Sequence, residues 1–156
     1  MNIIVNIKKA SGEVVEYLGH NNVTYEGDKY YAQKIAGETT SFDSPFLRLG
    51  YSEDAPDKLD ADVKDYVTDS KKAVDSGFPE RDNDDAGNGL GGENVITWRF
   101  TYDIGDFTGV DIAEGAIVDD GDNPTKALCR FLFDEKFTIE STDAVTIYVN
   151  HALRGV

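Results

Sequence analysis

Residues 95–104, Val-Ile-Thr-Trp-Arg-Phe-Thr-Tyr-Asp-Ile, carry the clearest structural signal in the chain. Large apolar or aromatic residues alternate along this stretch with polar residues. The apolar phase consists of Ile96, Trp98, Phe100, Tyr102 and Ile104. Because successive side chains of a β-strand point to opposite faces, the alternation predicts a strand with one buried face. Residues 126–133 and 144–150 repeat the pattern, so we expect the last sixty residues to be β-rich.

Further apolar runs, separated by Gly, Asp and Asn turns, predict strands on both sides of this stretch. They cover residues 2–8, 12–18, 46–50, 110–118, 127–133, 136–139 and 145–149. Tyr31 and Ile35, one helical turn apart, together with Gly37 predict a helix that ends near the glycine. The sequence therefore predicts a mainly β fold, an antiparallel β-sandwich or jelly-roll of about eight strands with one short helix near residues 25–36.

The chain has 156 residues, which fits a single β-sandwich domain covering residues 1–156. The pattern changes at about residues 51–92, where acidic residues, Gly and Pro dominate, and we expect an acidic excursion made mostly of loop. Within it, Leu59, Val63 and Val67 fit helical spacing and also fit the spacing of a strand, so periodicity leaves the two open.

Composition excludes several classes of partner. Thirty acidic residues against fifteen basic ones give a formal net charge of −15, which has the wrong sign for nucleic acid. The N-terminal residues resemble neither a signal peptide nor a membrane span, so we expect no membrane partner. The single cysteine, Cys129, lies in an apolar run and is expected to be a buried thiol.

One local pattern points to a metal. In Asp82–Glu93 the first, third, sixth and twelfth positions are Asp82, Asp84, Gly87 and Glu93, as in an EF-hand calcium loop. Ala86 stands where that loop needs an oxygen ligand, and the flanking segments do not read as paired helices. A solvated loop is therefore the favoured interpretation, with Ca²⁺ bound by Asp82, Asp84 and Glu93 as the alternative.

The sequence contains no nucleophile elbow, phosphate loop or His cluster at metal spacing, so we expect a protein that is not an enzyme and needs no cofactor. The candidate interface residues are Tyr148, His151 and Arg154. Tyr148 falls on the outward phase of the last strand, His151 lies near the end of that strand, and Arg154 belongs to the tail that follows it.

Several stretches together resemble small β-rich virion proteins of tailed bacteriophages and related archaeal viruses. The stretches are residues 20–32 (HNNVTYEGDKYYA), 46–56 (FLRLGYSEDAP), 97–102 (TWRFTY), 110–117 (VDIAEGAI) and 128–133 (LCRFLF). The resemblance implies a non-enzymatic structural protein, most simply a capsid decoration or cement protein that acts by repeated contacts. It also implies a homo-oligomer, with the major capsid protein or other virion proteins as partners. The implied location is the virion, assembled in the host cytoplasm.

Two alternatives stay open. The same family includes tail, baseplate and fibre components, which use such folds for receptor binding. A calcium-dependent carbohydrate-binding module is the alternative from a different class, motivated by the Asp82–Glu93 loop and by the tyrosines, because Tyr combines a flat apolar face with a hydroxyl group.

Overall fold

The structure is a computed structural model that describes residues 3–85 and 91–153. It contains one helix, α1 (Tyr25–Ile35), and nine strands. The strands are β1 (Ile3–Lys8), β2 (Val14–Val23), β3 (Phe46–Gly50), β4 (Lys72–Ala73), β5 (Glu80–Arg81), β6 (Val95–Tyr102), β7 (Gly109–Val118), β8 (Ala127–Ile139) and β9 (Ala144–Ala152). The prediction of a mainly β fold with one short helix is confirmed.

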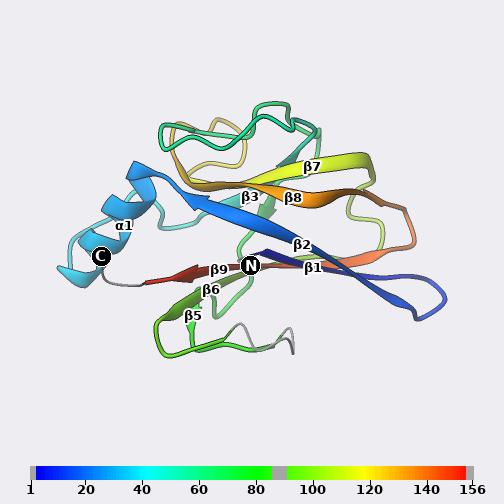
Figure 1. The fold of residues 1–156 in the computed structure, drawn as a ribbon, viewed down its shortest axis with the longest axis horizontal. Coiled ribbons are helices and arrows are strands. Elements are labelled where there is room, and N and C mark those ends of the chain that lie inside the picture. The colour runs from blue at the N-terminus through cyan, green and yellow to red at the C-terminus, as the bar shows by residue number, and fades with distance from the viewer. Residues whose placement is uncertain (1–2, 86–90, 154–156) are drawn as a thin grey trace.

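All nine strands belong to one antiparallel sheet in the order β4-β3-β7-β8-β2-β1-β9-β6-β5. Figure 1 shows how the sheet curls, with β3, β7 and β8 in one layer, β1, β9 and β6 in the other, and β2 running from one layer to the other. The two layers of the expected sandwich are thus parts of one continuous sheet.

The curled sheet is bridged on one side by Asp75, which follows β4. Its backbone N–H donates to the carbonyl oxygen of Arg99 in β6 at 2.9 Å. Its carboxylate accepts hydrogen bonds from the Arg99 side chain at 2.7 Å and from the Thr101 hydroxyl at 2.6 Å. A single residue therefore links β4, at one edge of the sheet, to β6, next to the other edge.

The main core fills the space between the layers and is rich in aromatic side chains. Trp98, Phe100 and Tyr102 are fully or almost fully buried, as the alternation along β6 predicts. Phe131 and Phe133 of β8 pack edge to face, with ring centroids 5.5 Å apart. Cys129 is buried within the same core, and burial raises the pKa of its thiol to about 12.

Helix α1 begins and ends where its sequence dictates. The hydroxyl of Thr24 caps the first turn by accepting a hydrogen bond from the N–H of Gly27 at 3.0 Å. Gly37 takes a positive φ of 72° just past the C-terminus, a conformation that glycine adopts without strain. Gly27 also lets the helix lie directly on β8, because a Cβ there would collide with the carbonyl oxygen of Leu128.

The stretch predicted as an acidic excursion is more ordered than a solvated loop. It contains the two shortest strands, β4 and β5, and residues 51–67 cover the outer face of β7 and β8, visible at the top of Figure 1. Val63 and Val67 are buried whereas Leu59 is 80% exposed, so the three apolar residues share neither a helix nor a strand. The buried side chains of Glu114 and Arg130 hold this segment on the sheet through hydrogen bonds to its backbone.

Candidate functional site

A depression lies beside the helix, and we call it the α1 hollow. It has a volume of about 350 Å³. It is lined by Tyr30, Tyr31, Lys34, Ile35, Pro79, Arg81, Ile96 and Leu153. The helix supplies four of these residues because its outer face turns toward β5, β6 and the segment after β9. Four stretches that are distant in the sequence therefore meet at one apolar depression.

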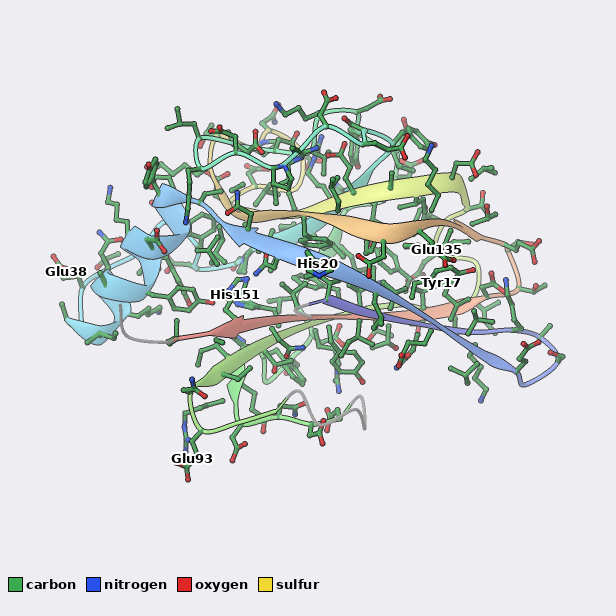
Figure 2. The ribbon with its side chains drawn as sticks, in the orientation of Figure 1. Tyr17, His20, Glu38, Glu93, Glu135 and His151 are labelled. Atoms are coloured by element: carbon green, nitrogen blue, oxygen red, sulfur yellow. The ribbon has the colours of Figure 1, made fainter. Side chains whose placement is uncertain are left out.

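A chain of hydrogen bonds runs beneath the hollow. The indole N–H of Trp98 donates to the hydroxyl oxygen of Tyr31 at 3.0 Å, and the Tyr31 hydroxyl is also hydrogen-bonded to Nδ1 of His151. Figure 2 labels His151, which lies inside the molecule and is only 2% exposed. One residue each from β6, α1 and β9 is thus joined under the hollow.

Burial decides which groups in this hydrogen-bond network are protonated. It lowers the pKa of His151 to about 3, so the imidazole is neutral at neutral pH, and it raises the pKa of the Tyr31 hydroxyl. Trp98 only donates, so Tyr31 accepts from it and donates its own proton to Nδ1 of His151. The imidazole proton is then on Nε2, which is buried and has no hydrogen-bond partner.

Two of the three predicted interface residues, Tyr148 and His151, lie in the described part of the chain. Tyr148 does lie on the face of β9 opposite to the core, but it is only 8% exposed, with Asp75, Asp85 and Arg99 close enough to influence its pKa. His151 is enclosed as described above. Neighbouring segments thus cover both side chains, and a contact with a partner at either one stays a prediction. Arg154 lies outside the described residues.

The predicted calcium ligands lie on an exposed turn after β5. Asp82 has a positive φ of 55° and donates its N–H to the carbonyl oxygen of Val95, while Glu93 accepts a hydrogen bond from Arg81 through its carbonyl oxygen. Residues 86–90 of the loop are outside the described part. Among residues 3–85 and 91–153, no three His, Cys, Asp or Glu side chains are grouped as a metal site, and calcium binding stays a prediction.

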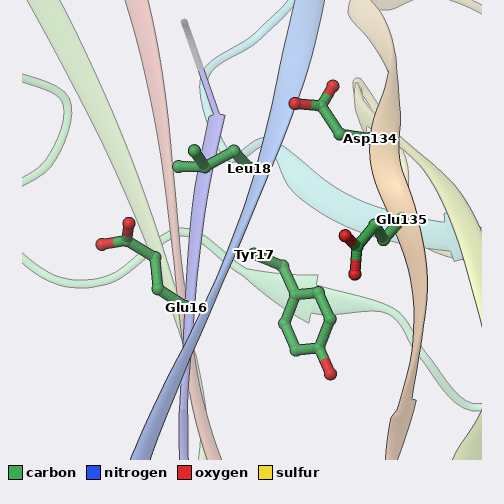
Figure 3. Close-up of a pocket in the computed structure, with 5 residues that line it drawn as sticks. All are labelled: Glu16, Tyr17, Leu18, Asp134 and Glu135. Atoms are coloured by element: carbon green, nitrogen blue, oxygen red, sulfur yellow. The ribbon is translucent and has the colours of Figure 1, made fainter.

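The second depression, which we call the β2–β8 notch, has a volume of about 150 Å³. It is lined by Glu16, Tyr17, Leu18, Asp134 and Glu135. Figure 3 shows that Asp134 and Glu135 point from β8 toward β2 and that the Tyr17 ring lies between the two strands. Tyr17 stacks against Phe137 with ring centroids 5.2 Å apart, which gives the notch an aromatic floor.

The notch exists because β2 and β8 are paired along only part of their length. Their ladder covers Gly19–Val23 of β2, whereas residues 14–18 pair with β1 alone. A Cβ at Gly19 would meet the carbonyl oxygen of Leu132, so the glycine allows the close approach at the point where the strands separate. The first half of β2 therefore presents an open backbone edge, with the carboxylates of Asp134 and Glu135 on the β8 side and that of Glu16 on the other side of β2 (Figure 3).

Neither depression was predicted as a site. The sequence pattern predicts Tyr31 in the helix and Trp98 in the core, and both predictions are confirmed, but nothing in local spacing links these residues to His151. The notch was missed because residues 134–135 read as a turn between two strands, whereas β8 continues through them.

The described residues define a mainly β fold with nine antiparallel strands in a curled sheet. In the described part of the chain, no helix is long and apolar enough to cross a membrane. Comparison with known proteins gave no relative: no family model, curated protein or solved structure matches the chain. The function is therefore proposed from the residues of this chain.

Proposed function

We propose that the chain is a non-enzymatic structural protein of a tailed-virus particle, a capsid decoration protein that acts through repeated protein–protein contacts. The resemblance of its sequence to small β-rich virion proteins gives the class. The observation that carries the mode of action is the open edge of β2 at residues 14–18 beside the β2–β8 notch.

An open strand edge offers backbone donors and acceptors that a strand of another protein can pair with. In this chain the edge is short, and at its end the His20 imidazole contacts the carboxylate of Asp134 at 2.9 Å. The carboxylates of Glu16 and Glu135 take part in none of the ion pairs of the described residues. We therefore assign the edge to an extended basic segment of the major capsid protein.

The copy number in purified virus particles tests the proposal. Quantitative mass spectrometry should give hundreds of copies per particle, in a fixed ratio to the major capsid protein, because decoration repeats with the symmetry of the shell. A handful of copies would instead assign the chain to a tail, baseplate or fibre. Absence from the particle would overturn the proposal as a whole.

Charge reversal at the notch tests the mode of action. The double variant Glu16→Lys and Glu135→Lys should lose occupancy on particles that lack the native protein, because a basic partner segment would then meet two lysines. The matched control is Glu38→Lys with Glu93→Lys, which changes the net charge equally at two exposed residues away from the notch (Figure 2). Equal occupancy of both double variants would contradict the assignment of the edge.

A further inference from the structure

The α1 hollow combines an apolar floor with cations that have no carboxylate partner. Its apolar lining includes the rings of Tyr30 and Tyr31 and the side chains of Ile35, Ile96 and Leu153. Ile35 is 83% exposed, so a large aliphatic side chain faces solvent at the edge of the hollow. The volume of about 350 Å³ lies within the range of small-molecule pockets.

Two cations line the hollow. Lys34 and Arg81 both line it, although acidic residues outnumber basic ones by thirty to fifteen. Nine other Lys and Arg residues of the described part form ion pairs with carboxylates, whereas Lys34 and Arg81, like Lys8, Lys29 and Lys126, form none. Lys34 lies 5.9 Å from the centroid of the Tyr30 ring, and Arg81 donates one hydrogen bond to the carbonyl oxygen of Glu93.

The hydrogen-bond chain below the hollow restricts what else can be recognised there. The hydroxyl of Tyr31 is already engaged by Trp98 and His151, so toward the hollow Tyr31 offers its ring and not its hydroxyl. His151 is buried beneath it and does not line the hollow. The charged groups of the lining are then the two cations, and apolar surface makes up most of the remainder.

We propose that the α1 hollow binds a small amphiphile made of an aliphatic or aromatic body and one carboxylate. The body packs on Tyr31, Ile35 and Ile96, and the carboxylate accepts charge-assisted hydrogen bonds from Lys34 and Arg81. This site is separate from the β2–β8 notch, and it does not depend on a role in a virus particle.

Titration of the full chain with sodium decanoate, below its micelle concentration, tests the proposal. The single tryptophan, Trp98, donates its indole N–H to Tyr31 in the lining, so its fluorescence should change saturably as the hollow fills. Calorimetry should give a matching dissociation constant and one site. Decyltrimethylammonium has the same chain with a cationic head, and it should bind at least about tenfold more weakly.

Variants separate this site from non-specific adsorption. The pair Lys34→Gln with Arg81→Gln should weaken decanoate binding by about tenfold or more, since both charged donors are lost. The pair Lys8→Gln with Lys29→Gln makes the same change in net charge at two exposed lysines outside the hollow, and it should bind like the native chain. Circular dichroism of both pairs checks that the fold is kept.

Three results would overturn the proposal. Absence of saturable decanoate binding to the native chain would overturn the proposal, as would equal affinity for the cationic amphiphile. Equal weakening in the two double variants would show that net charge, and not the α1 hollow, controls the binding, and this too would overturn it.

Discussion

At the scale of single residues, the most consequential group is the buried imidazole of His151. Its Nδ1 is bonded to Tyr31, and its Nε2 has no partner, so protonation would place a charge in the core without a carboxylate to balance it. This explains why burial lowers its pKa from 6.5 to about 3.

We expect His151 to make the free energy of unfolding depend on pH. Below about pH 6.5 the unfolded chain takes up a proton at this residue, and the folded chain does not until about pH 3, so stability falls as the pH falls through this range. The limiting slope is about 1.4 kcal/mol per pH unit. Urea unfolding between about pH 7 and about pH 4.5 measures it.

In the variant His151→Gln this contribution should disappear, leaving a flatter profile. The matched control is His20→Gln, which makes the same substitution at the exposed histidine. Burial raises the pKa of Asp62, which works in the opposite direction, but Asp62 is present in every variant and cancels in the comparison. Parallel profiles for the native chain and His151→Gln would refute the prediction.

At the scale of elements, the segment of residues 51–67 is fastened to the sheet by a buried ion pair. Glu114 of β7 and Arg130 of β8 are both fully buried, and their side chains meet at 2.6 Å. The Glu114 carboxylate also accepts backbone hydrogen bonds from Ser52 at 3.2 Å and from Asp65 at 2.9 Å. Arg130 in turn donates to the carbonyl oxygen of Asp54 at 2.9 Å.

The variant Glu114→Gln should lower the free energy of unfolding by up to about 3–5 kcal/mol, because it removes the carboxylate nearest to the buried Arg130 and leaves it only Asp60, at 3.3 Å. Urea unfolding measures the loss, and limited proteolysis should show new cleavage within residues 51–67. The control Glu53→Gln removes an exposed ion pair with Lys136 at 2.8 Å and should cost less than about 1 kcal/mol. A loss for Glu114→Gln as small as for the control would rule out the fastening role.

Much of the element order was predictable because it depends on local pattern. The alternation along residues 95–104 and the capping glycine after the helix placed β6 and α1 within two residues of their observed ends. The two short strands were missed because two residues carry no periodicity. The second half of β2 was missed because His20-Asn-Asn reads as a turn, although Asn21 pairs with Phe131 of β8.

The two depressions could not be predicted from local sequence patterns, because each is formed by residues that are far apart in the sequence. Tyr31 and His151 are 120 residues apart in sequence and meet only because β9 and α1 pack together. The exposed carboxylates of Asp134 and Glu135 look like turn residues until the register of β8 puts them opposite Tyr17. Residue spacing alone does not fix where side chains point, so the metal pattern of residues 82–93 stays a prediction.

At the scale of the whole molecule, the net charge of −15 works against the compact state, because like charges repel one another more strongly when the chain is folded. Ion pairs offset part of this, but most of them are at least partly exposed and contribute little. We therefore expect repulsion to exceed the attraction of the surface pairs.

The thermal unfolding midpoint should accordingly rise between about 0.01 M and about 0.5 M NaCl, as salt shortens the range of the repulsion. Differential scanning calorimetry at neutral pH measures this change. Near the sequence pI of 4.3 the same increase in salt should raise the midpoint less, since little net charge is left to screen. A midpoint at neutral pH that falls with salt would mean that the ion pairs outweigh the repulsion.

The pairing of β1 with β9 also constrains how the chain acquires its structure during synthesis. β1 contains the first described residues and β9 the last ones that form a strand, yet both lie in the middle of the sheet, with β9 between β1 and β6. Until residue 152 has left the ribosome, β1 and β6 each lack a neighbour, and the core between the layers stays open. Folding of the sheet is therefore completed only after translation has passed β9, and until then the nascent chain exposes the unpaired edges of two apolar strands, which chaperones can bind.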